Sequence, residues 1–218
     1  SIKSFLLFLC ITCNSIAQTA PFYKSYDWEK SPNYAIEAID TDMIALKEKV
    51  VTEFYFEDQD LTEYYLEHKV LLLNSDDRIE EYNKIYLPFS SSASLQVNKA
   101  RVIQKTGEVI ELDESKILSA ENEETGRKYK YFALEGIEKG SIVEYYYVVK
   151  RRPKYQGARL DIQTDYDKQI VEFDLYAPSN LLFTFKSFNL ETTVTKDETS
   201  LDKMHWQFSA KNIEGVDS

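Results

Sequence analysis

The stretch from Lys128 to Lys150, KYKYFALEGIEKGSIVEYYYVVK, constrains the fold of this chain more than any other stretch. Two runs rich in aromatic and β-branched residues flank a short segment that contains Gly136 and Gly140. This pattern predicts a β-hairpin with a longer loop. Side chains alternate along a strand, and both faces of residues 142–149 are largely apolar. We therefore expect this second strand to lie inside a sheet, covered on both sides, and Phe132 of the first strand to be buried.

Short apolar runs bounded by turn residues continue this β pattern from Lys49 onward. Glycine permits a positive φ, so a hairpin is expected around Thr106 and Gly107. Asp113 is expected to cap a single helical turn. About eleven short antiparallel strands predict an all-β fold of two packed sheets, a β-sandwich. The expected strands are residues 50–56, 62–73, 83–87, 101–105, 108–112, 129–134, 142–149, 170–176, 181–188, 190–196 and 203–209.

The first 17 residues are predicted to be a secretory signal peptide. Lys3 supplies a positive start, residues 5–11 form an apolar run too short to span a membrane, and Ser15-Ile16-Ala17 offers small residues for cleavage after Ala17. A lipoprotein anchored at Cys10 or Cys13 is the weaker alternative, because a leucine and a threonine precede these cysteines where a small residue is required. Cleavage after Ala17 would leave a chain without cysteine, held together by its core rather than by disulfides.

Residues 18–44 are expected to form a lead-in segment, and residues 45–218 a single β-sandwich domain. Trp28 of the lead-in is expected to pack on the body of the domain, while residues 35–46 fit either a short amphipathic helix or a loop that enters a strand. The formal net charge of −11 argues against nucleic acid or an anionic membrane as the main partner. It is typical of a well-solvated surface, and a basic partner or cations are the alternative.

No nucleophile–base pair is evident in the sequence. The only histidines are His68 and His205, and no serine lies in a G-x-S-x-G turn. His68 falls on an apolar strand face, so a hydrogen-bonded, half-buried side chain is favoured over a catalytic base. His205 alternates with Met204 and Trp206 and is expected to face the solvent. Two isolated histidines give no zinc-ligand spacing.

Carboxylates are numerous, so a pair such as Glu111 and Asp113 arises by chance, and glycosidase chemistry would need two of them held across a cleft. The acidic loop with Glu121, Glu123 and Glu124 lacks the regular spacing of calcium ligands. The basic cluster at residues 151–154 could hold a carboxylate or phosphate, but balancing nearby acids is favoured. We therefore expect no catalytic, metal-binding or cofactor-binding residue and no cofactor.

Several of these motifs together suggest a family. The runs NKIYLPF, ARVIQKTGEVIELD, KYFAL, GIEKGSIVEYYYVVK and Tyr176-Ala177-Pro178 resemble a bacterial domain of unknown function that precedes transglutaminase-like domains in exported proteins. The resemblance covers about residues 45–215. It implies an immunoglobulin-like β-sandwich, and a papain-like domain with its own Cys, His and Asp would be expected to follow Ser218. It therefore assigns no catalytic residue to this chain.

Three functions remain open from the sequence. The first is a non-catalytic module of an exported transglutaminase- or protease-like protein, periplasmic or secreted, that packs on the catalytic domain or helps present a protein or peptidoglycan substrate. The second is a free-standing module that binds a glycan or peptide, which an exposed row of tyrosines or tryptophans would favour. The third is a carboxylate hydrolase, which would need a deep cleft with paired acids.

Overall fold

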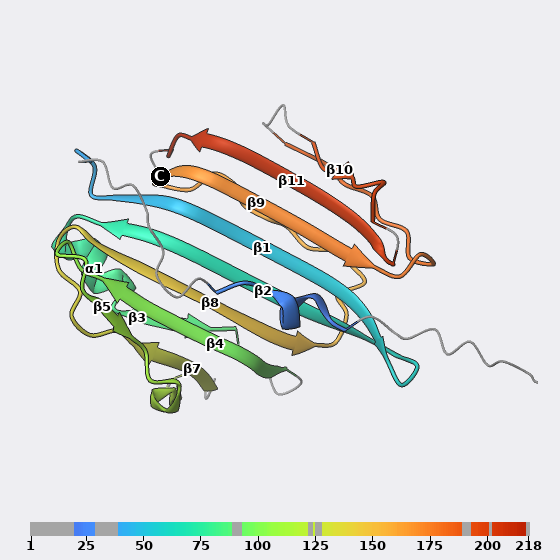
Figure 1. Ribbon diagram of the computed structural model, residues 1–218, viewed down its shortest axis with the longest axis horizontal. Coiled ribbons are helices and arrows are strands. Elements are labelled where there is room, and N and C mark those ends of the chain that lie inside the picture. Colours follow the sequence, from blue (N-terminus) through green and yellow to red (C-terminus); the bar gives the residue numbers. More distant parts are fainter. Residues whose placement is uncertain are drawn as a thin grey trace, which may run out of the picture.

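The structure is a computed structural model (Figure 1) that describes residues 20–28, 39–88, 93–121, 124, 128–188, 193–200 and 202–216. In this part of the chain, eleven strands form two sheets, and the only helices are α1 (Asp76–Tyr82) and the 3-10 turns η1 (Phe22–Ser25) and η2 (Glu114–Lys116). None of these helices has the length and apolarity needed to cross a membrane. The expected β-rich, two-sheet fold is confirmed. The predicted signal peptide lies outside the described residues.

Eight strands form one large sheet, in the order β10-β11-β9-β1-β2-β8-β4-β5 (Figure 1). β1 and β2 form a long hairpin whose turn holds Asp58 and Gln59 at positive φ. β8 lies between β2 and β4, and its residues 141–149 are all buried, as predicted. The strands are β1 (Met43–Glu57), β2 (Asp60–Leu73), β4 (Ser94–Ile103), β5 (Val109–Glu111), β8 (Ser141–Arg151), β9 (Asp167–Ala177), β10 (Thr195–Lys196) and β11 (Met204–Ile213).

One pair of neighbours in this sheet, β1 and β9, is parallel, so the expectation of purely antiparallel strands is wrong. The chain leaves β8 at one end of the sheet and returns to the other end before β9 begins, so β9 runs beside β1 in the same direction (Figure 1). Several strands are also longer than expected. The division of the described strands into eight and three differs from the four-plus-three arrangement of immunoglobulin constant domains.

The remaining strands form a small sheet in the order β3-β7-β6, with β3 at Lys84–Leu87, β6 at Leu118–Glu121 and β7 at Lys128–Ala133. β7 and β8 therefore belong to different sheets, and the hairpin predicted for residues 128–150 is wrong. Gly136 and Gly140 do adopt positive φ, of 74° and 87°. These two glycines turn the chain from the small sheet to the large sheet. A hairpin loop also uses glycines at positive φ, so the sequence pattern does not distinguish the two connections.

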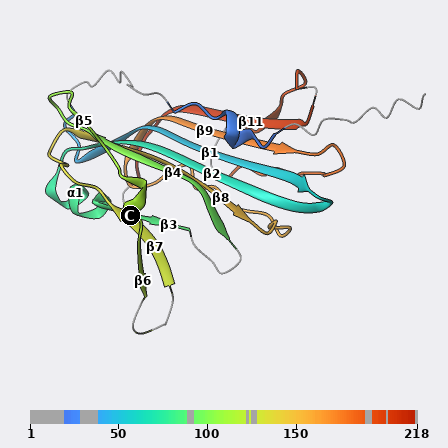
Figure 2. The same ribbon diagram turned by 60° about the horizontal axis from the view of Figure 1, so that its bottom comes forward.

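The small sheet packs against one face of the large sheet, and the largest apolar cluster fills the space between them (Figure 2). Phe132 of β7 is fully buried there, with its ring centroid 6.4 Å from that of Tyr145 on β8. Ile85 and Leu87 of β3 join it in the same cluster. The predicted burial of Phe132 is confirmed, although its strand pairs differently from the expectation.

Residues 181–188, predicted as a strand, belong to neither sheet. Leu181, Phe183 and Phe185 pack against Phe54 and Trp206 and the rest of a second apolar cluster on the large sheet. The sequence alternation correctly marks an extended segment with one packed face. It cannot specify whether the backbone of that segment finds a hydrogen-bonded neighbour.

The other two predicted hairpins are present. β4 pairs with β5 around Gly107, whose φ is 87°, and β10 pairs with β11, although only Thr195 and Lys196 of β10 take part. Asp113 caps the short turn η2 by accepting a hydrogen bond from the backbone N–H of Ser115, as expected. Residues 43–46, left open between helix and loop, are the start of β1.

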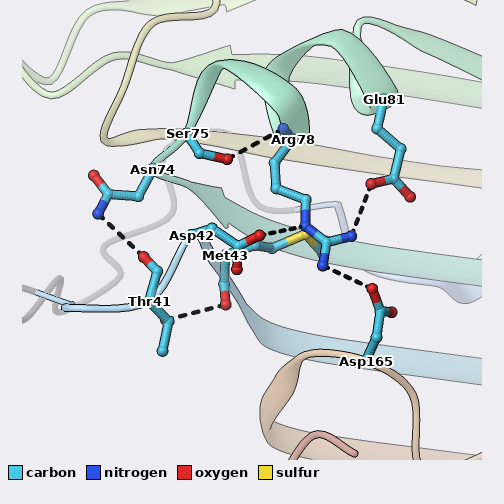
Figure 3. A network of polar contacts seen from close by, with 8 residues as sticks. All are labelled: Thr41, Asp42, Met43, Asn74, Ser75, Arg78, Glu81 and Asp165. Carbon is cyan, nitrogen blue, oxygen red and sulfur yellow. Dashed lines mark hydrogen bonds and ion pairs between the residues drawn. The ribbon is translucent and has the colours of Figure 1, made fainter. Parts of the chain in front are cut away.

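Arg78 of α1 connects the helix to neighbouring segments through ion pairs (Figure 3). Its guanidinium contacts three carboxylates: Nε lies 2.8 Å from Asp42, Nη1 2.8 Å from Glu81 and Nη2 2.7 Å from Asp165. Ser75 caps the first turn by accepting a hydrogen bond from the Arg78 backbone N–H. Burial opposes its charge, but hydrogen bonds to the three carboxylates raise the pKa of Arg78 well above its ordinary value. One side chain thus joins α1 to the residues before β1 and before β9.

The lead-in residues 20–28 cross the face of the large sheet opposite the small sheet (Figures 1 and 2). The rings of Phe22, Tyr23, Tyr26 and Trp28 pack there on a cluster that includes Tyr146. The backbone N–H of Phe22 donates to Glu53. The expected packing of Trp28 on the body is confirmed, and residues 20–28 of the lead-in are part of the folded unit.

Candidate functional site

A buried carboxylate, Glu144 of β8, joins three neighbouring strands beneath the lead-in. Its Oε1 lies 2.9 Å from His68 Nε2 of β2, and its Oε2 accepts a hydrogen bond from Arg101 Nε of β4 at 2.8 Å. The exposed fractions are 2% for Glu144, 6% for His68 and 0% for Arg101. The Tyr26 hydroxyl lies 2.7 Å from His68 Nδ1. His68 is therefore a hydrogen-bonded structural residue, as expected, and it is more deeply buried than expected.

The Arg101 guanidinium has a hydrogen-bond partner at only one of its three nitrogens in this network. Its Nη1 and Nη2 are buried without a hydrogen-bond partner, and Nη1 lies 3.8 Å from a carboxylate oxygen of Glu111. The indole ring of Trp28 lies over the guanidinium, with its centroid 4.2 Å from Arg101 Cζ. This cation–π contact offsets part of the cost of burying the charge. No local pattern indicates this network, because its three members lie far apart in the chain.

His205 of β11 faces the same side of the sheet and is buried, so its expected exposure to solvent is wrong. Its Nε2 lies 2.7 Å from Asp174 and its Nδ1 3.0 Å from Asp197. The ring stacks on Tyr176 at 4.3 Å between centroids. Both ring nitrogens contact carboxylates, and no hydroxyl group of a described residue hydrogen-bonds to them. Alternation along β11 placed His205 opposite Trp206 correctly, but the sequence could not show that this face is covered as well.

The carboxylates considered for hydrolysis do not meet. Glu111 faces Arg101 from β5, and Asp113 accepts hydrogen bonds from Ser115 at the cap of η2. A depression of about 190 Å³ lies at the β10–β11 loop, where Asp197, Glu198 and Asp202 share the lining with lysines. Neither Glu111 nor Asp113 lines it. Within the described residues no cluster of side chains that could hold a metal ion occurs.

The basic cluster at the end of β8 has a structural partner. Arg151 donates from Nε to Glu63 at 2.9 Å, and the backbone N–H of Lys154 donates to the same carboxylate. The basic cluster at residues 151–154 is thus balanced by a nearby acid, as favoured from the sequence. Glu123 of the acidic loop lies outside the described residues.

The outer face of the small sheet carries the most distinctive exposed group, which we call the tyrosine face: Tyr86 of β3, Tyr129 and Tyr131 of β7, with Lys84 and Leu118 beside them. Tyr86 pairs with Tyr131 across the two strands, and Tyr131 pairs with Leu118. Directly paired residues point to the same side of a sheet. Ile85 and Phe132 alternate with these tyrosines and point into the core, so the tyrosines point outward.

The three rings of the tyrosine face form one continuous surface. Their centroids are 5.5 Å apart for Tyr86 and Tyr129, 5.7 Å for Tyr86 and Tyr131, and 6.1 Å for Tyr129 and Tyr131. Lys84 Nζ lies 6.0 Å from the centroid of Tyr131. Tyr86 is 58% exposed and Leu118 47%. No hydrogen bond joins the three hydroxyls to another described residue. The sequence pattern had placed Tyr129 and Tyr131 on one face, but not at the surface.

Two buried carboxylates predict how stability depends on pH. Burial by itself raises the pKa of both Glu48 and Glu144. The charges of Lys69 and Lys168, and a hydrogen bond from Lys168, lower the pKa of Glu48 below the ordinary 4.5. Hydrogen bonds and charges from His68 and Arg101 do the same for Glu144. The unfolded chain therefore binds protons first as the pH falls, so the stability that these groups contribute is present above about pH 4.5 and is lost below it.

We expect the urea midpoint to fall steeply between about pH 5 and pH 3. Glu48→Gln should lower the midpoint at pH 7 and flatten this dependence, because its carboxylate binds Lys168 at 2.7 Å. Glu108→Gln is the matched control, since Glu108 is exposed in the β4–β5 turn. Equal pH slopes for Glu48→Gln and the unmodified chain would contradict the assignment.

Comparisons with known proteins agree with this picture of the fold. A model of the family described as "Domain of Unknown Function with solved-structure structure (DUF3857)" matches residues 59–216. No curated protein sequence matches the chain. One similar solved structure is a "putative protease" from Parabacteroides distasonis, with a TM-score of 0.69 and 13% identity over 81% of this chain. The match covers 36% of that chain, about a third of its length, and at this identity the likeness concerns the fold.

Proposed function

The chain belongs to the DUF3857 family of domains of unknown function, and on that premise we propose that it is a non-catalytic module of an exported protease- or transglutaminase-like protein. In this role it packs on a downstream catalytic domain, or helps present a protein or peptidoglycan substrate to it. The signal peptide at residues 1–17, the periplasmic or secreted location and an immunoglobulin-like relationship of the sandwich belong to the same proposal.

The observation that carries the proposal is the tyrosine face. Tyrosine supplies a large, rigid contact area with a polar tip, and it is enriched in the energetically dominant parts of protein interfaces. Interfaces between domains of one chain typically bury about 600–1,500 Å² and are fairly polar. A surface of three tyrosines, one lysine and Leu118 fits that description. Similarity to about a third of a longer chain described as a "putative protease" supports a modular arrangement.

The test compares amide hydrogen exchange in residues 18–218 alone with exchange in a longer polypeptide that carries the proposed downstream domain after Ser218. We expect β3, β6 and β7 to gain protection in the longer polypeptide. Tyr86→Ala should reduce this gain, because Tyr86 is the most exposed ring of the tyrosine face. Tyr155→Ala is the matched control, since Tyr155 is 79% exposed and lies outside the small sheet. Equal exchange of the small sheet in both polypeptides would contradict docking through this face.

The same face favours a second candidate function, binding of a glycan or peptide by the free module. Its three hydroxyls make no hydrogen bond with described residues, and its rings offer flat apolar surface beside them. Soluble peptidoglycan fragments titrated into residues 18–218 should shift the amide resonances of β3 and β7, and Tyr129→Ala should abolish the shifts. Binding unaffected by Tyr129→Ala would exclude the tyrosine face as the site.

A further inference from the structure

The extended segment at residues 181–188 includes a stretch, residues 182–186, whose main chain is unpaired within the described part of the protein. No turn or bend occurs from 181 to 187, and half-buried residues alternate with exposed ones. The backbone N–H of Leu181 donates to the Pro178 carbonyl at 3.2 Å. For residues 182–186, neither the backbone N–H nor the C=O groups hydrogen-bond to the described part of the chain. Leu182 is 94% exposed.

Aromatic packing fixes this segment on the large sheet. The Phe183 ring lies 5.3 Å from that of Phe54 on β1 and 5.1 Å from Trp206 on β11. The Phe185 ring lies 6.5 Å from Phe173 on β9 and 6.1 Å from Trp206. The inward side chains therefore hold the backbone extended before any partner arrives. Little conformational entropy remains to be lost on binding, which favours association.

We propose that residues 182–186 accept a β-strand from another polypeptide by strand addition. A strand presents N–H and C=O groups at the spacing of an extended main chain, so a polypeptide is the ligand class that matches this edge. Exposed, unpaired strand backbone is a template for such pairing. The outward side chains Leu182 and Thr184 would contact the side chains of the incoming strand, which favours β-branched or apolar residues there.

The occupant is a different polypeptide rather than a second copy of this chain. The chain carries a net charge of −11, which disfavours a second copy and attracts a strand with basic residues. This site lies on the β9 side of the large sheet and shares no residue with the tyrosine face. The inference therefore stands or falls independently of the proposed function.

The test uses a blocked peptide of alternating threonine and valine with a lysine at each end as the probe. Added to the isotope-labelled protein, it should protect alternate amides of the segment from exchange, either 182, 184 and 186 or 183 and 185, because alternate N–H groups face opposite edges of a strand. The same peptide N-methylated at alternate residues has lost its donors, and we expect it to bind at least about tenfold more weakly.

Thr184→Pro provides the protein-side test. Thr184 donates no hydrogen bond from its backbone within the described chain, so proline removes no hydrogen bond from the free fold, but it removes a donor from the edge formed by 182, 184 and 186. Thr184→Ala keeps that donor and is the control. We expect proline alone to abolish protection of these even-numbered amides. Should the proline variant not fold, the N-methylated peptide tests the same interaction on the unmodified chain.

Three results would overturn the inference. The first is unchanged exchange at 182–186 with saturating peptide. The second is equal binding of the peptide and its N-methylated form. The third is concentration-dependent self-association of the chain through this segment in sedimentation experiments, which would make a second copy the occupant.

Discussion

Glu144→Ala is expected to lower the free energy of unfolding by about 3–5 kcal/mol, because it leaves the charge of Arg101 buried without its carboxylate. The Arg101 side chain is 0% exposed, and Glu144 Oε2 is its only hydrogen-bond partner among the described residues. His68 would lose the partner of Nε2 in the same step. Urea unfolding at pH 7 measures the change, with far-UV circular dichroism to confirm that the variant folds.

The double variant Arg101→Met with Glu144→Leu separates the cost of an unpaired charge from the cost of altered packing. Replacing both members of a buried ion pair by apolar side chains of similar volume is often nearly neutral. We therefore expect the double variant to be more stable than Glu144→Ala, although the unpaired His68 nitrogen keeps it below the unmodified chain. A loss below about 1 kcal/mol for Glu144→Ala would mean that water reaches Arg101 and that the network is not sealed by the lead-in.

Phe132→Ala is expected to cost about 3–5 kcal/mol as well, for a different reason. Phe132 is 0% exposed in the middle strand of the small sheet, and it fills the space between the two sheets beside Tyr145. Truncation leaves a cavity at the point where the layers meet. Its neighbour Tyr131 points outward from the same strand, so Tyr131→Ala should cost no more than about 1 kcal/mol.

The contrast between these two neighbours tests the register of β7 directly. A shift by one residue would exchange the buried and exposed faces of the strand. If Phe132→Ala left the urea midpoint nearly unchanged while Tyr131→Ala lowered it strongly, the small sheet would have the opposite orientation. The tyrosine face would then be part of the core, and the docking surface proposed here would not exist.

Prediction from the sequence succeeded where the signal is local. Apolar alternation identified β8 as a strand covered on both faces, and it placed Phe132 in the core and Tyr131 on the opposite face. Gly107 marked the turn of the β4–β5 hairpin, because that position needs a positive φ. The expectation that this protein carries no catalytic residues stays a prediction.

Prediction failed where the outcome depends on which segments pair. The run at residues 128–150 contains two strands and two glycines at positive φ, yet its strands join different sheets. Residues 181–188 alternate like a strand but pair with none in the described chain. His205 alternates with core residues, and it is buried because Asp174, Asp197 and Tyr176 meet it on a face that the pattern assigned to solvent.

The sequence alone determined most of the strands, the buried faces of β7 and β8 and several turns, because side-chain alternation and glycine dihedrals are properties of a few consecutive residues. Only the tertiary structure decided that β9 runs parallel to β1, that Glu144 brings together His68 and Arg101, and that Tyr86 joins Tyr129 and Tyr131 at the surface. These features each unite residues from separate strands. The free energy that selects them comes from packing and hydrogen bonding between segments, which no local pattern encodes.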